Sequence, residues 1–178
     1  MIGNFIADSV RGKTFERYPE TVQRGIRLHR KIDTYTDNHP VVFESKDRLR
    51  AEFGKWAPVI VDVFYDHFLA IHWNRYHSLP LADFSQSVYA ILEEHFDLLP
   101  ERIQGFLPYM TGGDWLFNYS KLSGIERALW GISRRSRYNP EMDKSVAVLR
   151  EQFAGFEDEF LRFFPDLEAM VADEMSAT

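Results

Sequence analysis

The chain has 178 residues, of which 45% are hydrophobic and 15% aromatic, and its net charge is −6. This composition is typical of one folded domain and excludes a disordered chain, and the absence of cysteine excludes disulfides and thiolate metal sites. The acidic balance argues against general nucleic-acid binding, which needs a basic surface.

No membrane span or secretory signal is predicted. The most apolar stretch, residues 59–73, contains Asp62 and Asp66, so it is not suited to cross a bilayer. The first ten residues are too short for a secretory signal, and Asp8 interrupts them. We therefore expect a cytoplasmic protein without a membrane or nucleic-acid partner. The sequence leaves the oligomeric state open.

Nearly every segment has helical periodicity, and prolines mark the boundaries. Pro19 suits the first turn of a helix that ends near Asn38, just before Pro40. Further helices are expected over residues 40–56, 57–77, 83–99, 100–108, 114–119 and 123–133. A last long helix is expected from residue 140, with an interruption or a kink near Pro165. The sequence thus predicts a single all-α domain over residues 1–178.

Two groups of polar residues recur at helical spacing. They are His29, Asp33 and Asp37 in the first group, and Asp62, Asp66 and His67 in the second. Residues four apart share a helix face, so each group can direct several donors to one point. Because charges on an apolar helix face need partners, we expect either a divalent cation between two helices or a network of core salt bridges. The spacing alone does not decide between these two interpretations.

Basic residues form two local clusters in this acidic chain. One cluster is Arg134, Arg135 and Arg137, and the other, which flanks His29, is Arg24, Arg27, Arg30 and Lys31. Arginine presents a fork of donors to phosphate oxygens, so both clusters suit a phosphorylated substrate or an acidic protein partner. Cations at a helix C-terminus also complement the helix dipole, which is the purely structural interpretation of residues 134–137.

Four segments carry a family resemblance. They are GNFIADSVRGK (3–13), GIRLHRKIDTYTDNHP (25–40), APVIVDVFYDHFLAIHW (57–73) and GISRRSR (131–137). Together they resemble the acyl carrier protein phosphodiesterase family, also called ACP hydrolase, over nearly the whole chain. The combination of His-x-x-x-Asp-x-x-x-Asp with Asp-x-x-x-Asp-His is more specific than either motif alone.

The resemblance implies an HD-like helical bundle that uses Mn²⁺, or else Mg²⁺ or another divalent ion. It implies removal of 4′-phosphopantetheine from holo acyl carrier protein, an acidic protein substrate, to give the apo form. The metal ligands implied at matching positions are Asp8, His29, Asp33 and Asp66. Asp62 and His67 would act as acid and base, with Asp37 in support. Arg30, Arg134, Arg135 and Arg137 would contact the substrate or partner.

Members of this family usually carry an apolar N-terminal segment with a histidine before the Gly-Asn motif. Here that motif is Gly3-Asn4, so we expect the usual N-terminal segment and its histidine to be missing. Loss of that ligand would lower the affinity for the metal, and the sequence leaves open whether the polypeptide is active. Two other functions stay open on the residues alone. One is an HD-like phosphohydrolase that acts on a nucleotide or small phosphoester, and the other is a non-catalytic helical protein that binds an acidic partner.

Overall fold

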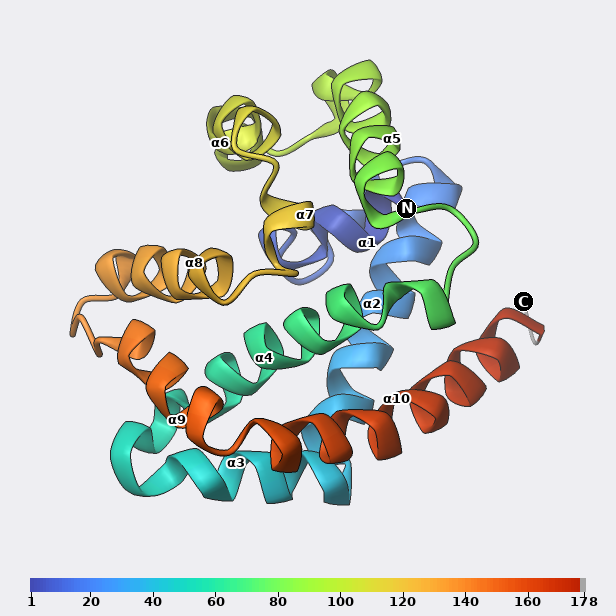
Figure 1. The fold of residues 1–178 in the computed structure, drawn as a ribbon. Coiled ribbons are helices and arrows are strands. Elements are labelled where there is room, and N and C mark those ends of the chain that lie inside the picture. Colours follow the sequence, from blue (N-terminus) through green and yellow to red (C-terminus); the bar gives the residue numbers. More distant parts are fainter. Residues whose placement is uncertain (177–178) are drawn as a thin grey trace.

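The computed structural model describes residues 1–176, and none of these residues lies in a β-strand (Figure 1). The α-helices are α1 (Ile2–Ile6), α2 (Glu20–Asn38), α3 (Pro40–Phe53), α4 (Ala57–Ile71), α5 (Leu81–Glu94), α6 (Glu101–Gly112), α7 (Trp115–Asn118), α8 (Leu122–Arg135), α9 (Ser145–Glu151) and α10 (Phe153–Ser176). Short 3₁₀ turns join several of them. The prediction of an all-α fold is confirmed over this range.

The boundary between α2 and α3 lies where the prolines predict it. α2 ends at Asn38 because His39 adopts an extended conformation before Pro40, which then occupies the first turn of α3. Nδ1 of His39 accepts a hydrogen bond from the backbone N–H of Val41 (3.3 Å). Its Nε2 donates to Asp166 of α10 (3.3 Å), so this turn is fixed to a distant helix as well.

Three other helices end at positions that differ from the predicted ones. α4 stops at Ile71 and α5 at Glu94, five or more residues early, and the 3₁₀ turns Trp73–Arg75 and Phe96–Leu98 follow them. A tightened last turn of this kind is common where a helix ends. By contrast, α6 continues through Pro108, which lies at the surface. A proline removes one backbone donor, and at this exposed position that loss does not end the helix.

The prediction of one helix that starts at residue 140 and is interrupted near Pro165 is wrong in its start and in its interruption. Asn139 and Glu141, on either side of Pro140, have positive φ angles of 38° and 49°, so no helix begins there. The break instead falls at Gln152, between α9 and α10. α10 then runs without interruption through Pro165 because its buried aromatic side chains hold it against the core.

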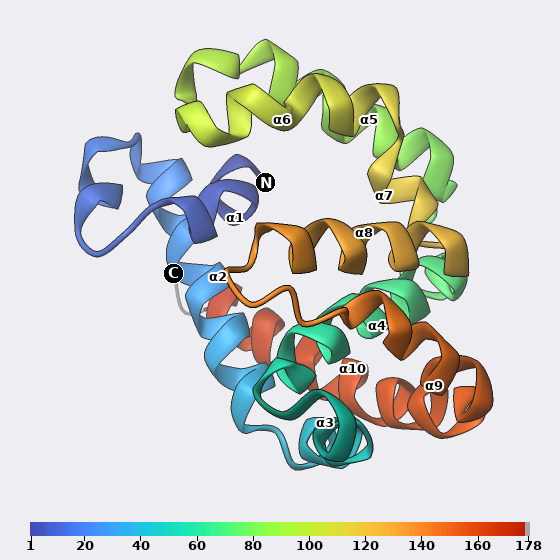
Figure 2. The ribbon, with the colours of Figure 1, turned by 90° about the vertical axis from the view of Figure 1, so that its left-hand side faces the viewer.

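α4 lies in the middle of the molecule (Figures 1 and 2). Helices α5 and α6 lie at one end and α3, α9 and α10 at the other, with α4 and α8 between them, and α2 runs from the first end towards the second. Ile60, Val61, Phe64 and Phe68 of α4 are fully buried. Within the described residues, no helix is long and apolar enough to cross a membrane.

The hydrophobic core has two parts. The larger part surrounds α4 and contains side chains from α3, α8, α9 and α10. The smaller part joins α1 and α2 to α5 and α6. The two helices that carry the predicted polar residues, α2 and α4, therefore contribute their buried faces to different parts of the core.

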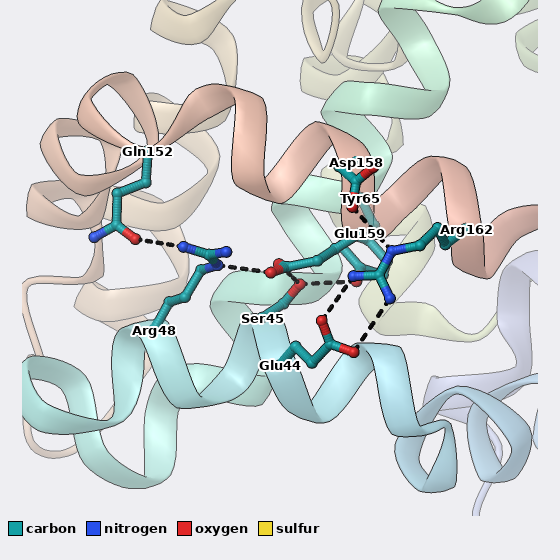
Figure 3. A network of polar contacts seen from close by, with 8 residues as sticks. All are labelled: Glu44, Ser45, Arg48, Tyr65, Gln152, Asp158, Glu159 and Arg162. Atoms are coloured by element: carbon teal, nitrogen blue, oxygen red, sulfur yellow. Dashed lines mark hydrogen bonds and ion pairs between the residues drawn. The ribbon is translucent and has the colours of Figure 1, made fainter.

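A buried polar network ties α10 to α3 and α4 (Figure 3). Glu159, which is 1% exposed, accepts hydrogen bonds from Nε of Arg48 (2.7 Å) and Oγ of Ser45 (2.5 Å). The same Oγ lies 2.8 Å from the hydroxyl of Tyr65. Because a buried carboxylate is stable only when it is paired, this network fixes how α10 lies on α3.

Candidate active site

Three polar side chains from the first part of the chain come together. Asp8 lies in the 3₁₀ turn Ala7–Ser9, and His29 and Asp33 lie one turn apart on α2. Nε2 of His29 is 3.1 Å from Oδ1 of Asp8 and 3.5 Å from Oδ2 of Asp33. One ligand atom from each residue lies within 4.8 Å of the other two. We call these three residues the His29 cluster.

Close contact between α1 and α2 positions this cluster. A Cβ atom at Gly3 would lie 2.0 Å from the carbonyl oxygen of Val22, and one at Gly25 would lie 3.0 Å from the backbone nitrogen of Asn4. Glycine at both positions lets the two backbones touch. As a result Asn4 lies over α2, where its Oδ1 accepts a hydrogen bond from Nδ1–H of His29 (2.9 Å). This bond turns Nε2 of the ring towards the carboxylates.

A cavity of about 600 Å³ borders the His29 cluster. Asp8 and Asp66 both line it, so a carboxyl group of α4 faces the same space as the cluster. Arg102 of α6 and Arg135 at the end of α8 bring positive charge to the wall. The apolar part of the wall includes Trp73, Leu81, Phe84, Phe106, Trp115 and Leu116. The cavity is therefore polar on the side of the cluster and apolar elsewhere.

The members of the His29 cluster shift one another's pKa values. The hydrogen bond with His29 holds the pKa of Asp8 below its usual value, and the same bond raises the pKa of His29. Partial burial raises the pKa of Asp33, an effect that the nearby His29 opposes. Asp8 thus stays ionised over a wide pH range and attracts cations to the cluster.

The two α4 carboxyls have much larger shifts. Burial, with a contribution from the charge of Asp62, raises the pKa of Asp66 to about 7. Burial also raises the pKa of Asp62, and the nearby carboxylates contribute to the rise, which brings the value to about 6. These carboxylates belong to Asp37, Asp33 and Asp8. Both side chains contact water, Asp66 inside the cavity, but the surrounding protein weakens their hydration.

Asp62 and Asp37 do not line the cavity. Asp37 pairs instead with Lys46 of α3, whose Nζ is 2.9 Å from its Oδ1. The Lys46 ammonium also partly offsets the rise in the pKa of Asp62. Asp62 therefore lies within electrostatic range of both this ion pair and the His29 cluster.

His67 is not brought to the cluster. It is buried, and its Nδ1–H donates to the carbonyl oxygen of Tyr119 (2.7 Å). Its ring faces Phe68 and Phe153, with centroids 5.6 and 6.1 Å away. Burial lowers the pKa of His67, which favours the neutral ring. Its contact instead holds Tyr119, a residue that lines the cavity.

The predicted arginines occupy different places. Of this set, Arg135 lines the cavity. Arg134 lies over the ring of Trp130, 5.0 Å from its centroid, and Arg137 is exposed. Arg30 donates to two backbone carbonyls of the loop before α2 (2.9 and 3.2 Å). Arg135 is therefore placed to contact a ligand in the cavity, whereas Arg30 holds the loop before α2.

Sequence reasoning missed Asn4 and Arg102. Asn4 lies in a segment that resembles the family, but a single amide side chain gives no sign of the histidine it contacts, which is 25 residues away. Arg102 follows the Leu99-Pro100 turn and has no polar motif around it. Its place in the cavity wall depends on how α6 packs against the smaller part of the core, which no local pattern reveals.

Fold and site together define an all-helical protein with a histidine–carboxylate cluster beside a largely apolar cavity, an arrangement suited to a divalent cation and an organic ligand. The chain belongs to the acyl carrier protein phosphodiesterase family, whose model matches residues 1–167.

Relatives from three bacteria support this assignment, and each is called acyl carrier protein phosphodiesterase. The protein from Yersinia pestis is 32% identical over 168 residues, covering 94% of this chain and 87% of the relative. The Serratia proteamaculans protein is 33% identical over 175 residues, covering 98% and 91%. The protein from Escherichia coli O157:H7 is 35% identical over 175 residues, covering 96% and 89%. No solved structure matches the chain.

Proposed function

We propose that this chain hydrolyses the phosphodiester bond between 4′-phosphopantetheine and acyl carrier protein, which returns the carrier to its apo form. Membership of the family and the name shared by the relatives support the proposal. One observation carries it: the donor atoms of Asp8, His29 and Asp33 lie within 4.8 Å of one another beside a cavity that is also lined by Asp66 and Arg135.

The donors of the His29 cluster suit a divalent cation. Carboxylate oxygens and an imidazole nitrogen are ligands that Mn²⁺ accepts readily. The carboxylate oxygens of the cluster are also ligands that Mg²⁺ accepts. We propose Mn²⁺ as the physiological ion, held by Asp8, His29 and Asp33, with Asp66 completing the set. When bound, the ion would stabilise charge on the phosphoryl oxygens and lower the pKa of a water molecule.

The chain's own residues would supply binding and proton transfer. Arg135, together with Arg102, presents guanidinium groups to the phosphate of the diester. Hydrolysis breaks the bond between phosphorus and the carrier's oxygen, which takes up a proton as it leaves. Asp62, with a pKa of about 6, is suited to exchange a proton near neutral pH, and because it does not line the cavity it would do so through a water molecule. His67 acts as a positioning residue through its hydrogen bond to Tyr119.

The shape and polarity of the cavity suit the pantetheine arm. The arm is a long, uncharged chain with amide groups, and a volume of about 600 Å³ is within the usual range for small-molecule sites. Phe84, Phe106 and Trp115 offer apolar surface to its methylene and methyl groups. The charged phosphate would then lie towards Asp8 and the two arginines.

The test is an assay of the purified chain with holo acyl carrier protein and added Mn²⁺, followed by mass spectrometry of the intact carrier. The expected result is loss of the phosphopantetheine arm. His29→Ala is expected to lower kcat/KM at least about 100-fold, because it removes a cation ligand. His95→Ala is the matched control, since the His95 ring bonds to the Ile91 carbonyl within the same helical turn (3.0 Å).

Two results would contradict the proposal. Hydrolysis of nucleotides in place of holo carrier would assign the site to a small phosphoester. A chain that binds no Mn²⁺, and in which His29→Ala changes Tm alone, would be a non-catalytic binding protein.

A further inference from the structure

Charge is distributed very unevenly along this chain. Residues 11–31 contain seven lysines and arginines but only two acidic residues, so this segment has a net charge of +5. Since the whole chain has a net charge of −6, the remaining residues together carry −11. The segment comprises the loop after Asp8 and the first half of α2, which leads into His29.

Four cations of this segment are exposed and form no ion pair within residues 1–176. They are Arg11, Lys13, Arg17 and Arg24, which we call the basic lobe. The other three cations of the segment have partners. Arg27 pairs with Glu20 (2.9 Å), Lys31 pairs with Glu174, and Arg30 bonds to backbone carbonyls. The basic lobe is therefore positive charge that has no ion-pair partner among residues 1–176.

The loop that carries Arg11, Lys13 and Arg17 of the basic lobe is held firmly on α2, which carries Arg24. Arg30 donates to the carbonyl oxygens of Val10 (2.9 Å) and Gly12 (3.2 Å), one on each side of Arg11. Gly12 has a φ of 54°, which allows the chain to turn there. Because Arg30 follows His29 on α2, the same helical turn fixes both Arg11 and the His29 cluster.

The ring of Phe15 provides a second attachment of this loop. The guanidinium carbons of Arg27 and Arg30 lie 5.2 and 5.1 Å from its centroid. Nε2 of Gln23 donates to the carbonyl oxygen of Tyr18 (2.9 Å). Figure 2 shows the loop as a projection beside α1 and the start of α2. Arg11 is thus held beside the helical turn of the His29 cluster, and Lys13 and Arg17 follow it on the same fixed loop.

The chemistry of the proposed reaction places the carrier protein beside the His29 cluster. The bond that breaks joins the phosphate directly to the carrier, so the carrier's surface must come within contact distance of residues around Asp8. The arginine cluster at the end of α8 is a less suitable dock for acidic groups. The hollow beside Arg134 is also lined by Asp143, whose charge opposes a negative partner, and by Glu141, which pairs with Lys144 (2.9 Å).

We propose that the basic lobe is the docking surface for the carrier protein, and that it receives an acidic face of the carrier next to the phosphodiester. This inference rests on the proposed function for the identity of the partner. Opposite charges steer the two proteins together and set the carrier's phosphate towards Asp8. The cations act in binding, so their loss should appear in KM and in the encounter rate.

The experiment compares two double charge reversals in the full chain. Lys13→Glu/Arg17→Glu alters the basic lobe, and Arg50→Glu/Arg150→Glu makes the same change in net charge on α3 and α9, at the other end of the molecule. All four side chains are exposed. For each protein, the Kd for apo carrier is measured by calorimetry and kcat and KM for holo carrier by mass spectrometry, at low and high salt.

The lobe variant is expected to raise Kd and KM about tenfold or more at low salt and to show a weaker salt dependence than the wild type. The control variant is expected to stay within about twofold. Equal losses of affinity for the carrier in the two variants, or no loss of affinity in the lobe variant, would overturn the docking surface. Tighter binding of an RNA oligonucleotide than of carrier protein at the same salt would also overturn it.

The two proposals fail in different ways. If the wild-type chain releases no phosphopantetheine from holo carrier, the proposed function fails, while the Kd for apo carrier still tests the basic lobe. If turnover is normal but both double variants bind carrier as the wild type does, the docking surface fails and the proposed function stands.

Discussion

At the scale of single residues, His29 is held by partners on both ring nitrogens. Asn4 accepts from Nδ1–H, and the carboxylates of Asp8 and Asp33 lie next to Nε2. In the absence of a cation both nitrogens act as donors, which agrees with the raised pKa of this histidine. A cation would replace the proton on Nε2 and leave the bond to Asn4 in place.

Asn4→Ala is expected to weaken Mn²⁺ binding about 10- to 100-fold, because the ring loses the acceptor that orients it. Asn4→Asp keeps an oxygen acceptor and should retain most of the affinity. Calorimetric titration with Mn²⁺ measures both. If Asn4→Ala and Asn4→Asp lose the same amount, orientation of His29 by this bond is not the cause.

The pKa values predict how cation binding depends on pH. Mn²⁺ at the proposed ligands would require ionised Asp66 and neutral His29. The cation-free protein holds protons on both groups as the pH falls, since both pKa values are raised. Protons therefore compete with the cation at low pH. The affinity should rise from about pH 5 and level off above about pH 8.

Titrations with Mn²⁺ across this range test the sign. Asp66→Asn should bind more weakly and with a shallower pH dependence, because it removes one of the competing protons. Asp97→Asn, at an exposed position in the turn after α5, is the control. An affinity that falls as the pH rises towards neutrality would refute this account.

At the scale of elements, the crossing of α1 and α2 decides whether the site forms. α1 has only five residues and would not persist as an isolated helix. It is held because Gly3 and Gly25 allow direct backbone contact with α2, and because Ile6 is buried in the smaller part of the core. This crossing sets Asn4 and Asp8 against His29.

Gly25→Ala is expected to destabilise the protein by about 1–3 kcal/mol, because the added methyl group would meet the α1 backbone at 3.0 Å. It should also weaken Mn²⁺ binding, because the methyl group would push α1, and Asn4 with it, away from His29. Thermal unfolding and Mn²⁺ titration measure the two effects.

Gly105→Ala is the matched control within α6. A Cβ atom there meets nothing within 4 Å, so the change should be neutral or stabilise by up to about 1 kcal/mol. If Gly25→Ala proves as harmless as Gly105→Ala, the close approach of α1 and α2 does not limit stability.

At the scale of the whole molecule, the proposed ligands come from separate segments. Asp8 precedes α2, His29 and Asp33 lie on α2, and Asp66 lies on α4 beyond the whole of α3. The unfolded chain does not hold these groups together, so a cation at the proposed site would bind the folded state preferentially. Folding and cation binding should therefore be coupled.

Mn²⁺ at about 100 times its Kd is expected to stabilise the fold by about 2.7 kcal/mol. For a chain of this size that corresponds to a rise in Tm of roughly 5–10 °C. Differential scanning calorimetry with and without Mn²⁺ measures the shift. His29→Ala should remove most of it, and a shift of equal size in this variant would place the ion at another site.

The sequence by itself determined the features that depend on neighbouring residues. Proline spacing and apolar periodicity predicted an all-α chain and the bounds of α2, because these signals act within one or two helical turns. The four-residue spacing of His29 and Asp33 likewise predicted their shared face. The resemblance of the quoted motifs also named the family that the comparisons assign.

Only the tertiary structure decided which groups from distant segments meet. Asp66 and His67 are adjacent in sequence, yet one lines the cavity and the other bonds to Tyr119, because successive residues of a helix point about 100° apart and the packing of α4 selects which side is open. The continuity of α10 through Pro165 and the placing of Asn4 at His29 have the same origin. Both depend on contacts between helices, which outweigh local propensity and leave no local pattern in the chain.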